Sequence, residues 1–273
     1  MDIQVLGPLK ADIDGVSIVP TAGKPRQILA LLAFCPGRVM PVPTLMEEIW
    51  GTDLPRSAMT TLQTYILQLR RHLGAAMGPD APGSAKDVLA TRHGGYLLRI
   101  PPESVDVHRY EQLVAAGRSA FDAGEDERAA GLFRKALDMW QGPALVDMRV
   151  GPVLEIEVMR LEESRLGIIE QRIDADLRLG RHSELLAELT DLIARHPQHE
   201  GLHSQAMVAL YRSGRQAAAL DVYRGLRTRL IEELGVEPSP RLQRLHQAML
   251  TVDPALDAVS GPRRTSTFDL YAA

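Results

Sequence analysis

The feature that most constrains the fold is a repeat in the second half of the chain. Gly180-Arg181 and Gly214-Arg215 lie 34 residues apart, which is the period of tetratricopeptide helix-turn-helix repeats. Apolar residues occupy matching positions after each glycine, in the pairs Leu185/Ala219, Leu186/Leu220, Leu189/Tyr223 and Leu192/Leu226. The sequence therefore predicts an all-α, tetratricopeptide-like domain over residues 102–252.

The first hundred residues follow another pattern. Short apolar runs typical of strands occupy residues 3–6, 9–13 and 16–19. Helical spacing then predicts three helices, of which the third runs from about Ser57 to Leu73 and ends at Gly74. Beyond a loop at 74–87, β-type segments at 88–90 and 96–100 flank a hairpin turn at 91–95. Strands, three helices and a hairpin, in that order, predict an α+β winged helix-turn-helix N-terminal domain over residues 1–101.

Charge separates the two predicted domains, which meet at Pro101-Pro102. Residues 1–100 hold 10 basic and 8 acidic residues, whereas residues 101–273 hold 21 and 27. Within the first half, residues 56–99 hold 6 basic and 2 acidic residues, so positive charge is concentrated there. We therefore expect any phosphate binding in the first domain. Residues 253–273 have no periodicity and are predicted to form a flexible tail.

Composition excludes several classes of protein. Apolar residues make up 45% of the chain and charged residues 24%, as in soluble globular proteins. No run approaches the roughly 18 to 20 apolar residues that a membrane span needs, and no basic and apolar leader follows Met1. The single cysteine, Cys35, excludes an internal disulfide and a thiolate zinc site. We expect a cytoplasmic protein with no membrane partner.

The third predicted helix is the candidate for reading DNA, because this helix of a winged helix lies in the major groove. With Leu62 on the core side and steps of about 100° per residue, the opposite face and its flanks hold Thr60, Thr64, Tyr65, Leu67, Gln68, Arg70 and Arg71. Short polar side chains suit base edges, and arginines suit phosphates or guanine. The pattern fits a solvated amphipathic helix equally well, so the face alone leaves both interpretations open.

Three further basic residues are candidates for DNA contacts. Arg92, at the tip of the predicted hairpin beside Gly94 and Gly95, is placed to enter a minor groove, although a surface arginine in a turn would look the same. Lys24 and Arg26 begin the first helix and are candidates for phosphate contacts, although a solvated surface position is the commoner situation for such residues. The order of elements and the basic hairpin together favour DNA binding.

Signals for catalysis are weak. Gly23-Lys24 looks like the end of a phosphate-binding loop, but Pro25 replaces the hydroxyl residue that would hold magnesium, and no glycine precedes it at the required spacing. His199 and His203 have the i, i+4 spacing of a metal site, but Pro197 breaks the segment and no partner ligand is set apart. The sequence predicts no catalytic residue, no metal and no cofactor, and hence not an enzyme.

Several segments resemble a known family. The segments 6–9 (LGPL), 23–32 (GKPRQILALL), 48–51 (EIWG), 61–74 (TLQTYILQLRRHLG) and 94–98 (GGYLL) are similar to the OmpR-type winged helix of the Streptomyces antibiotic regulatory proteins, a DNA-binding domain of the two-component type. The segments 210–220 (LYRSGRQAAAL) and 232–238 (EELGVEP) are similar to the bacterial transcriptional activation domain of the same family. The resemblance covers residues 1–252.

The resemblance implies a sequence-specific DNA-binding transcriptional activator, pathway-specific for a secondary-metabolite (antibiotic) gene cluster. Its expected partners are double-stranded promoter DNA with direct repeats near the −35 region, and RNA polymerase holoenzyme through its sigma factor and its α and β subunits. Self-association on the DNA and association with the nucleoid are also implied. Two other functions stay open: a repressor with the same DNA-binding domain, and a helical-repeat scaffold for protein interactions whose third-helix face is inert.

The resemblance also implies roles for individual residues. In OmpR-type relatives the position of Gln68 touches bases and that of Arg92 enters the minor groove. The positions along phosphates correspond to Thr60, Tyr65 and Arg70. Trp50, which lies in a matched segment, joins these DNA-binding candidates. Leu67 departs from the pattern, because relatives often carry a basic residue there.

Overall fold

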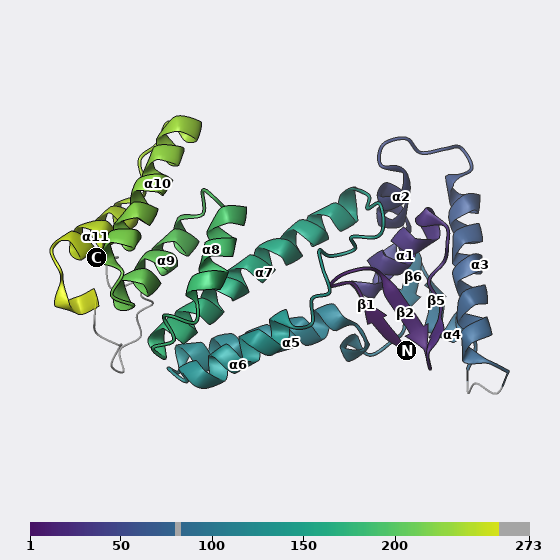
Figure 1. Ribbon diagram of the computed structural model, residues 1–273. Coiled ribbons are helices and arrows are strands. Elements are labelled where there is room, and N and C mark those ends of the chain that lie inside the picture. The colour runs from purple at the N-terminus through teal and green to yellow at the C-terminus, as the bar shows by residue number, and fades with distance from the viewer. Residues whose placement is uncertain (80–82, 257–273) are drawn as a thin grey trace. The chain divides into compact units, whose positions relative to one another are not determined.

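The structure is a computed structural model that describes residues 1–79 and 83–256. By its internal contacts the chain forms two compact units: unit 1 is Met1–Leu113 with Lys135–Leu166, and unit 2 is Val114–Arg134 with Gly167–Ala273. Figure 1 labels their elements. Helices α5 (Asp106–Asp122), α6 (Asp126–Leu137) and α7 (Pro152–Arg178) contribute residues to both units.

Unit 1 contains two antiparallel sheets of three strands each among its described residues. Strands β1 (Asp2–Gln4), β2 (Lys10–Ile13) and β3 (Val16–Ser17) form the first sheet. Strands β4 (Val39–Pro41), β6 (Gly95–Leu98) and β5 (Leu89–Arg92) form the second, in that order. The sequence did not predict β4, because a strand of three residues with only Met40 buried is too short to show a period.

Three helices complete the winged helix: α1 (Gly23–Ala33), α2 (Val42–Trp50) and α3 (Ala58–Met77). The buried stripe of α3 consists of Leu62, Ile66, Leu69 and Leu73, none of which is more than 2% exposed. The predicted α+β winged helix-turn-helix is thereby confirmed. One bound was wrong: α3 continues through Gly74 to Met77, because a single glycine weakens a helix by about 1 kcal/mol without ending it. The predicted loop at 74–87 also contains most of α4 (Ala85–Val88).

The winged helix is joined to residues 135–166 by buried carboxylates. Glu48, on α2, is 1% exposed and accepts hydrogen bonds from the backbone N–H groups of Gly151 (2.6 Å), Val153 (3.1 Å) and Leu154 (2.8 Å), where α7 begins. A Cβ atom on Gly151 would lie 1.8 Å from the Glu48 carbonyl oxygen, so only glycine allows this approach. Glu48 thereby satisfies three of the unpaired N–H groups at the start of a helix.

A second buried carboxylate joins the first strand to α5. Asp106, after the short 3₁₀ helix η1 (Pro102–Ser104), accepts hydrogen bonds from the backbone N–H groups of Val5 (2.9 Å) and Leu6 (3.0 Å). Asp147 likewise accepts one from the N–H of Leu9 at 2.8 Å. These contacts connect residues on the two sides of the predicted boundary at 101–102, and the boundary itself stays a prediction.

Unit 2 consists of helices that turn at glycines. Gly124 separates α5 from α6, Gly180 follows α7, and Gly214 separates α9 (Glu200–Arg212) from α10 (Gln216–Leu234). Their φ angles of 77°, 81° and 74° are left-handed values that glycine adopts without steric cost. Helix α9 packs against α8 (Leu186–Arg195), α10 and α11 (Pro240–Leu250). The predicted all-α second domain is confirmed, and the 27 residues of α7 interrupt the even repeat spacing.

The predicted tail begins inside the described part of the chain. Pro254–Leu256 forms the 3₁₀ helix η2, in which Leu256 is 3% exposed. The remaining residues of the predicted tail, 257–273, lie outside the described residues. Among the helices that the structure describes, none combines the length and apolar character required to cross a bilayer.

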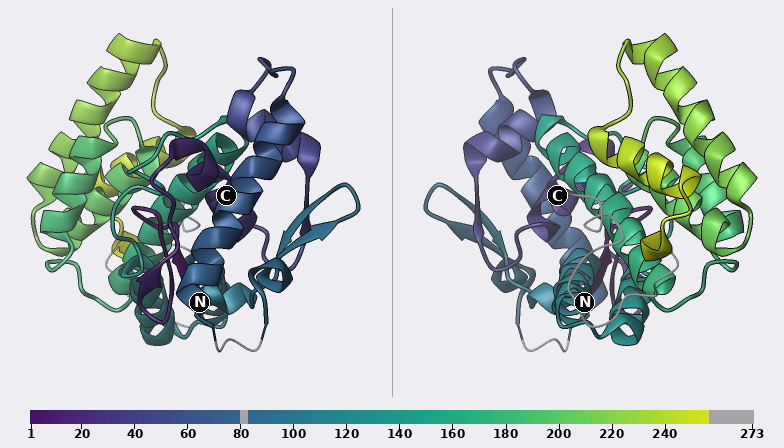
Figure 2. Two further views of the ribbon diagram at one scale, coloured as in Figure 1. Left: turned by 90° about the vertical axis from the view of Figure 1, so that its right-hand side faces the viewer. Right: turned by 90° about the vertical axis from the view of Figure 1, so that its left-hand side faces the viewer.

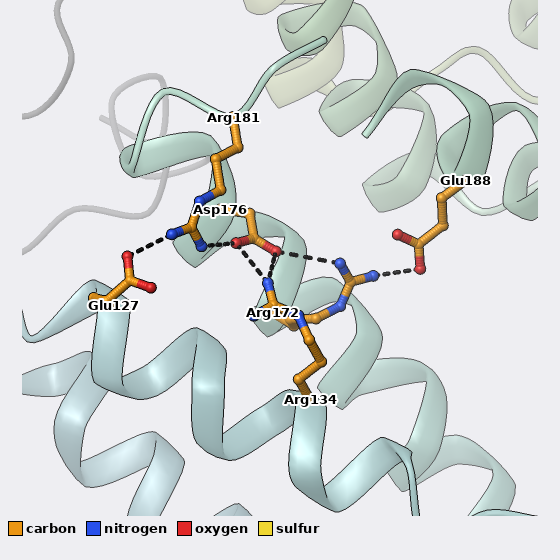
Figure 3. Close-up of polar contacts among 6 residues, drawn as sticks. All are labelled: Glu127, Arg134, Arg172, Asp176, Arg181 and Glu188. Atoms are coloured by element: carbon orange, nitrogen blue, oxygen red, sulfur yellow. Dashed lines mark hydrogen bonds and ion pairs between the residues drawn. The ribbon is translucent and has the colours of Figure 1, made fainter. Parts of the chain in front are cut away.

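A cluster of arginines around one aspartate holds the helices of unit 2 together. Figure 3 shows three guanidinium groups that converge on the carboxylate of Asp176, which is 2% exposed. Arg134 of α6 donates to both oxygens at 3.0 Å, Arg172 donates at 3.2 Å and Arg181 at 2.8 Å. The outer ends of the cluster are Glu188, bound by Arg172, and Glu127, bound by Arg181. Hydrogen bonds to Glu127 and Asp176 raise the pKa of Arg181 above its usual value.

Candidate nucleic-acid interface

Helix α3 presents a continuous uncovered face opposite its buried stripe. The exposed residues of this face are Thr60, Gln63, Thr64, Leu67 and Arg71, and Gln68 beside them is half-buried. The left view of Figure 2 shows α3 at the surface of unit 1, with the β5–β6 hairpin extended beside it. None of the 20 residues of α3 is acidic. The face therefore has no carboxylate of its own to repel a phosphate group.

Tyr65, Trp50 and Lys24 form a line of contacts along one flank of α3. The rings of Tyr65 and Trp50 stack with centroids 6.4 Å apart and planes at 25°. The Lys24 Nζ atom lies 5.1 Å from the centroid of the Trp50 ring, within the range of a cation–π contact. The three candidates, predicted from separate segments, are thereby brought together on α1, α2 and α3.

Lys24 and Trp50 also line a pocket of about 520 Å³. The pocket contains a second cation, Arg149, and two carboxylates, Glu48 and Glu155. Its two positive and two negative side chains balance, and Glu48 is already engaged by the start of α7. The pocket is therefore not an anion site in itself, and the contacts of Lys24 with DNA would have to be made outside it.

Two predicted DNA contacts are engaged inside the protein. Arg70 donates through Nε and Nη2 to the Leu89 carbonyl oxygen at 2.9 and 2.8 Å, and through Nη2 to Thr91 Oγ1 at 2.9 Å. It thereby fastens α3 to β5. Arg26 forms an ion pair with Asp147, and its side chain is 19% exposed. We do not include either arginine among the proposed DNA contacts.

Arg92 occupies a slightly different place from the one predicted. It pairs with Gly95 as the last residue of β5, so the turn itself consists of His93 and Gly94 rather than residues 91–95. Arg92 is exposed, and its Nη1 donates only to the carbonyl oxygen of the adjacent Thr91 among the described residues, at 3.3 Å. The guanidinium is thus held beside the turn and not at its tip.

Two histidines of the 196–203 segment, His199 and His203, have structural roles. His199 is the N-cap of α9 and its Nδ1 accepts a hydrogen bond from the Leu202 N–H at 3.4 Å. His203 is 4% exposed, and its Nδ1 lies 3.0 Å from the carbonyl oxygen of His199. Burial lowers the pKa of His203. No group of three potential metal-ligating side chains gathers anywhere in the described parts of the chain.

Sequence reasoning missed the carboxylates that position α2 and α5. Burial raises the pKa of Glu48 above its ordinary value, although three backbone N–H groups oppose the shift. Burial likewise raises the pKa of Asp106, against the N–H groups of Val5 and Leu6. A signal was available for Glu48, because it shares the buried face of α2 with Leu45 and Ile49, where an acid is out of pattern.

Two family models match the chain. "Transcriptional regulatory protein, C terminal" matches residues 18–98. "Bacterial transcriptional activator domain" matches residues 105–250. The two matches occur in the order in which the structure places the winged helix and the helical region.

Similar proteins cover nearly the whole chain. "Regulatory protein DnrI" of Streptomyces peucetius is 54% identical over 262 residues, which are 96% of each chain. "Regulatory protein AfsR" of Streptomyces coelicolor is 40% identical over 94% of this chain but only 25% of its own length. The structure of Mycobacterium tuberculosis EmbR in complex with a low affinity phosphopeptide has a TM-score of 0.85 at 33% identity, over 94% of this chain and 68% of that one.

Proposed function

Because this chain belongs to the Streptomyces antibiotic regulatory protein family, we propose that it binds direct repeats near the −35 region of promoters in a secondary-metabolite gene cluster and recruits RNA polymerase to them. The family consists of transcriptional regulators and not of enzymes. The chain is a DNA-binding transcriptional activator. The binding of direct repeats and the contacts with RNA polymerase are what we propose in addition.

The acid-free, exposed face of α3 is the observation that carries the DNA-binding part. Duplex DNA carries one negative charge for about every 1.7 Å of its axis, so a helix that enters a groove meets phosphates on both sides. Arg71, at the C-terminal end of this face, is exposed and forms no ion pair with any residue that the structure describes. Its guanidinium is therefore available to a phosphate.

The side chains of the face have different tasks in this proposal. The Gln68 amide pairs with the donor and acceptor edge of an adenine, for which its geometry is suited. Arg92 enters the minor groove beside the hairpin. The residues that follow the sugar-phosphate strands are Thr60, Tyr65, Trp50, Lys24 and Arg71. Contacts of this second kind position the protein and carry no sequence information.

In this proposal the helical region is the part of the activator that contacts other proteins. Residues 101–273 hold 21 basic and 27 acidic residues, a net charge of 21 − 27 = −6, which opposes contact with DNA. Its match to the bacterial transcriptional activator domain supports contact with RNA polymerase through the sigma factor and the α and β subunits. Direct repeats place two chains side by side on one face of the promoter, and we propose that they associate there.

A mobility-shift titration tests the proposal. The probes are promoter fragments of the gene cluster around the coding sequence, with scrambled duplexes as controls, at several salt concentrations. We expect preference for the promoter fragments and an affinity that falls steeply with salt, since each neutralised phosphate contributes a slope of about 0.9. Transcription from the same fragments by RNA polymerase holoenzyme should rise. A fall in transcription would indicate a repressor, and absence of DNA binding would favour a protein-interaction scaffold.

A further inference from the structure

We propose that Thr64 and Leu67 together read the C5-methyl group of a thymine in the major groove. The inference rests on the proposed function and concerns the same face of α3. It adds a base-specific role for two neighbouring side chains, one of which is apolar. The resemblance assigns no contact to Leu67, and the sequence assigns Thr64 to base edges without naming a base.

The exposure of Leu67 is the first observation. Its side chain is 47% exposed, although the rest of the apolar residues at the centre of α3 are buried. It lies on the uncovered face, two residues before the buried Leu69 and four residues before Arg71. A leucine in this place is not part of the buried core. Its apolar surface stays in contact with water until a partner covers it.

The orientation of the Thr64 hydroxyl is the second observation. Thr64 Oγ1 donates a hydrogen bond to the carbonyl oxygen of Thr60, one turn earlier, at 3.0 Å. The polar atom is thereby turned toward the helix backbone. The γ-methyl group remains as the part of Thr64 that can meet a base. Because residues i and i+3 are neighbours on a helix surface, this methyl group and Leu67 form one small apolar patch.

The surroundings of the patch identify its occupant as DNA and not protein. Thr60, Gln63, Gln68 and Arg71 border it, and α3 has no acidic residue. An apolar patch of two side chains inside a polar, cationic face is too small for a protein interface, which needs about 800 Å² on each partner. The same face is complementary in charge to phosphate strands.

The major groove offers one apolar group to such a patch. Thymine presents its C5-methyl group there, whereas guanine presents two acceptors, cytosine a donor, and adenine an acceptor and a donor. Placing Leu67 against those groups would leave them without hydrogen-bond partners, which costs free energy. The patch therefore favours thymine and disfavours the other three bases. The recognised repeat contains a thymine whose methyl group is needed for full affinity.

Uracil substitution tests this inference directly, because it removes the methyl group and leaves the base pair intact. Each thymine of a promoter fragment that the intact protein binds specifically is replaced in turn, and the Kd is measured by fluorescence anisotropy. We expect one thymine in each repeat at which uracil weakens binding about fourfold, the value for one buried methyl group. Leu67→Ala should bind the thymine duplex more weakly than the unmodified protein does. Uracil substitution should then cause no additional loss of affinity in this variant.

Met59→Ala is the matched control. Met59 lies on the same helix and is also 47% exposed, but it stands about 80° away from Leu67 around the helix axis. We expect this variant to keep the full sensitivity to uracil, and Leu67→Ile to keep most of it. Circular dichroism and thermal melting check that each variant is folded.

Two outcomes would overturn the inference. If the intact protein binds the fragment specifically but tolerates uracil at every position, no methyl group is read, and the proposed DNA-binding function survives. If Leu67→Ala keeps the same uracil sensitivity as the unmodified protein, another side chain reads the methyl group. Failure of the intact protein to prefer promoter DNA over scrambled DNA would instead overturn the proposed function, and this inference with it.

Discussion

Arginines serve opposite purposes in two regions of the molecule. In unit 2, three of them converge on Asp176, and two of these extend to Glu127 and Glu188 (Figure 3). On α3 and the β5–β6 hairpin, Arg71 and Arg92 are exposed and pair with no carboxylate in the described part of the chain. An arginine with an internal acid builds structure, whereas one without it is available for a phosphate.

The buried carboxylates of the two units explain how this difference arises. Asp176 is neutralised by arginine side chains. Glu48 and Asp106, in unit 1, are satisfied by backbone N–H groups. Unit 1 therefore satisfies these two acids with backbone donors and not with hydrogen bonds from arginine side chains. Arg26, paired with Asp147, and Arg70, bound to β5, are the arginines of the winged helix that do take structural roles.

The largest expected effect is on the free energy of unfolding and concerns the arginine cluster of unit 2. Asp176→Ala should lower the free energy of unfolding by about 3 kcal/mol, the lower end of the range for removing one partner of a buried ion pair. The lower end applies because Arg134 is 48% exposed and can turn to solvent, and Arg172 keeps Glu188. Urea denaturation measures the change. Glu188→Ala, at a position 43% exposed, is the control and should cost less than about 1 kcal/mol.

A smaller effect is expected where a carboxylate binds backbone amides. Glu48 Oε1 accepts from Gly151, and Oε2 accepts from Val153 and Leu154. In Glu48→Gln the amide NH₂ group, itself a donor, must face one of these sets of N–H donors. We therefore expect the free energy of unfolding to fall by about 1 to 3 kcal/mol. Hydrogen exchange should show faster exchange at Val153 and Leu154. Unchanged protection of those amides would mean that Glu48 does not hold the start of α7.

The pH dependence of stability gives a third, smaller effect. Burial raises the pKa of Asp106 above its ordinary value of 3.8, so the folded state binds this proton more tightly than the unfolded state. The stabilisation from that proton is full below pH 3.8 and is lost as the pH rises through the raised pKa. As the pH rises through this window, the unfolding free energy of the unmodified protein should therefore fall relative to that of Asp106→Asn. A difference that is constant with pH would contradict the raised pKa.

The smallest expected effect concerns the hairpin. Arg92→Ala should weaken binding mainly to repeats flanked by A/T-rich sequence, because a narrow minor groove concentrates negative potential around an inserted arginine. Titrations with A/T-rich and G/C-rich flanks, on otherwise identical duplexes, measure this difference. Equal losses on both would indicate a simple phosphate contact from a residue beside the turn.

The sequence predicted the order of elements well and the internal contacts poorly. The buried stripe of α3 and the glycine turns of unit 2 depend on local spacing, which a sequence displays directly. The partners of Arg70 and Arg26 lie 19 and 121 residues away along the chain, so no local pattern distinguishes them from the exposed Arg71. The clamps made by Glu48 and Asp106 span about a hundred residues for the same reason.

The measurement that most directly tests the central claim is a salt-dependent anisotropy titration of Gln68→Ala and Arg71→Ala. Arg195→Ala is the control, since that side chain is 70% exposed in unit 2 and pairs only with Asp191 among the described residues. We expect Gln68→Ala to cost about 1 to 3 kcal/mol on the promoter repeat and little on scrambled DNA. Arg71→Ala should weaken both alike and lower the salt slope by about one. If Gln68→Ala and Arg71→Ala bind DNA as the control and the unmodified protein do, α3 does not bind DNA and the account is wrong.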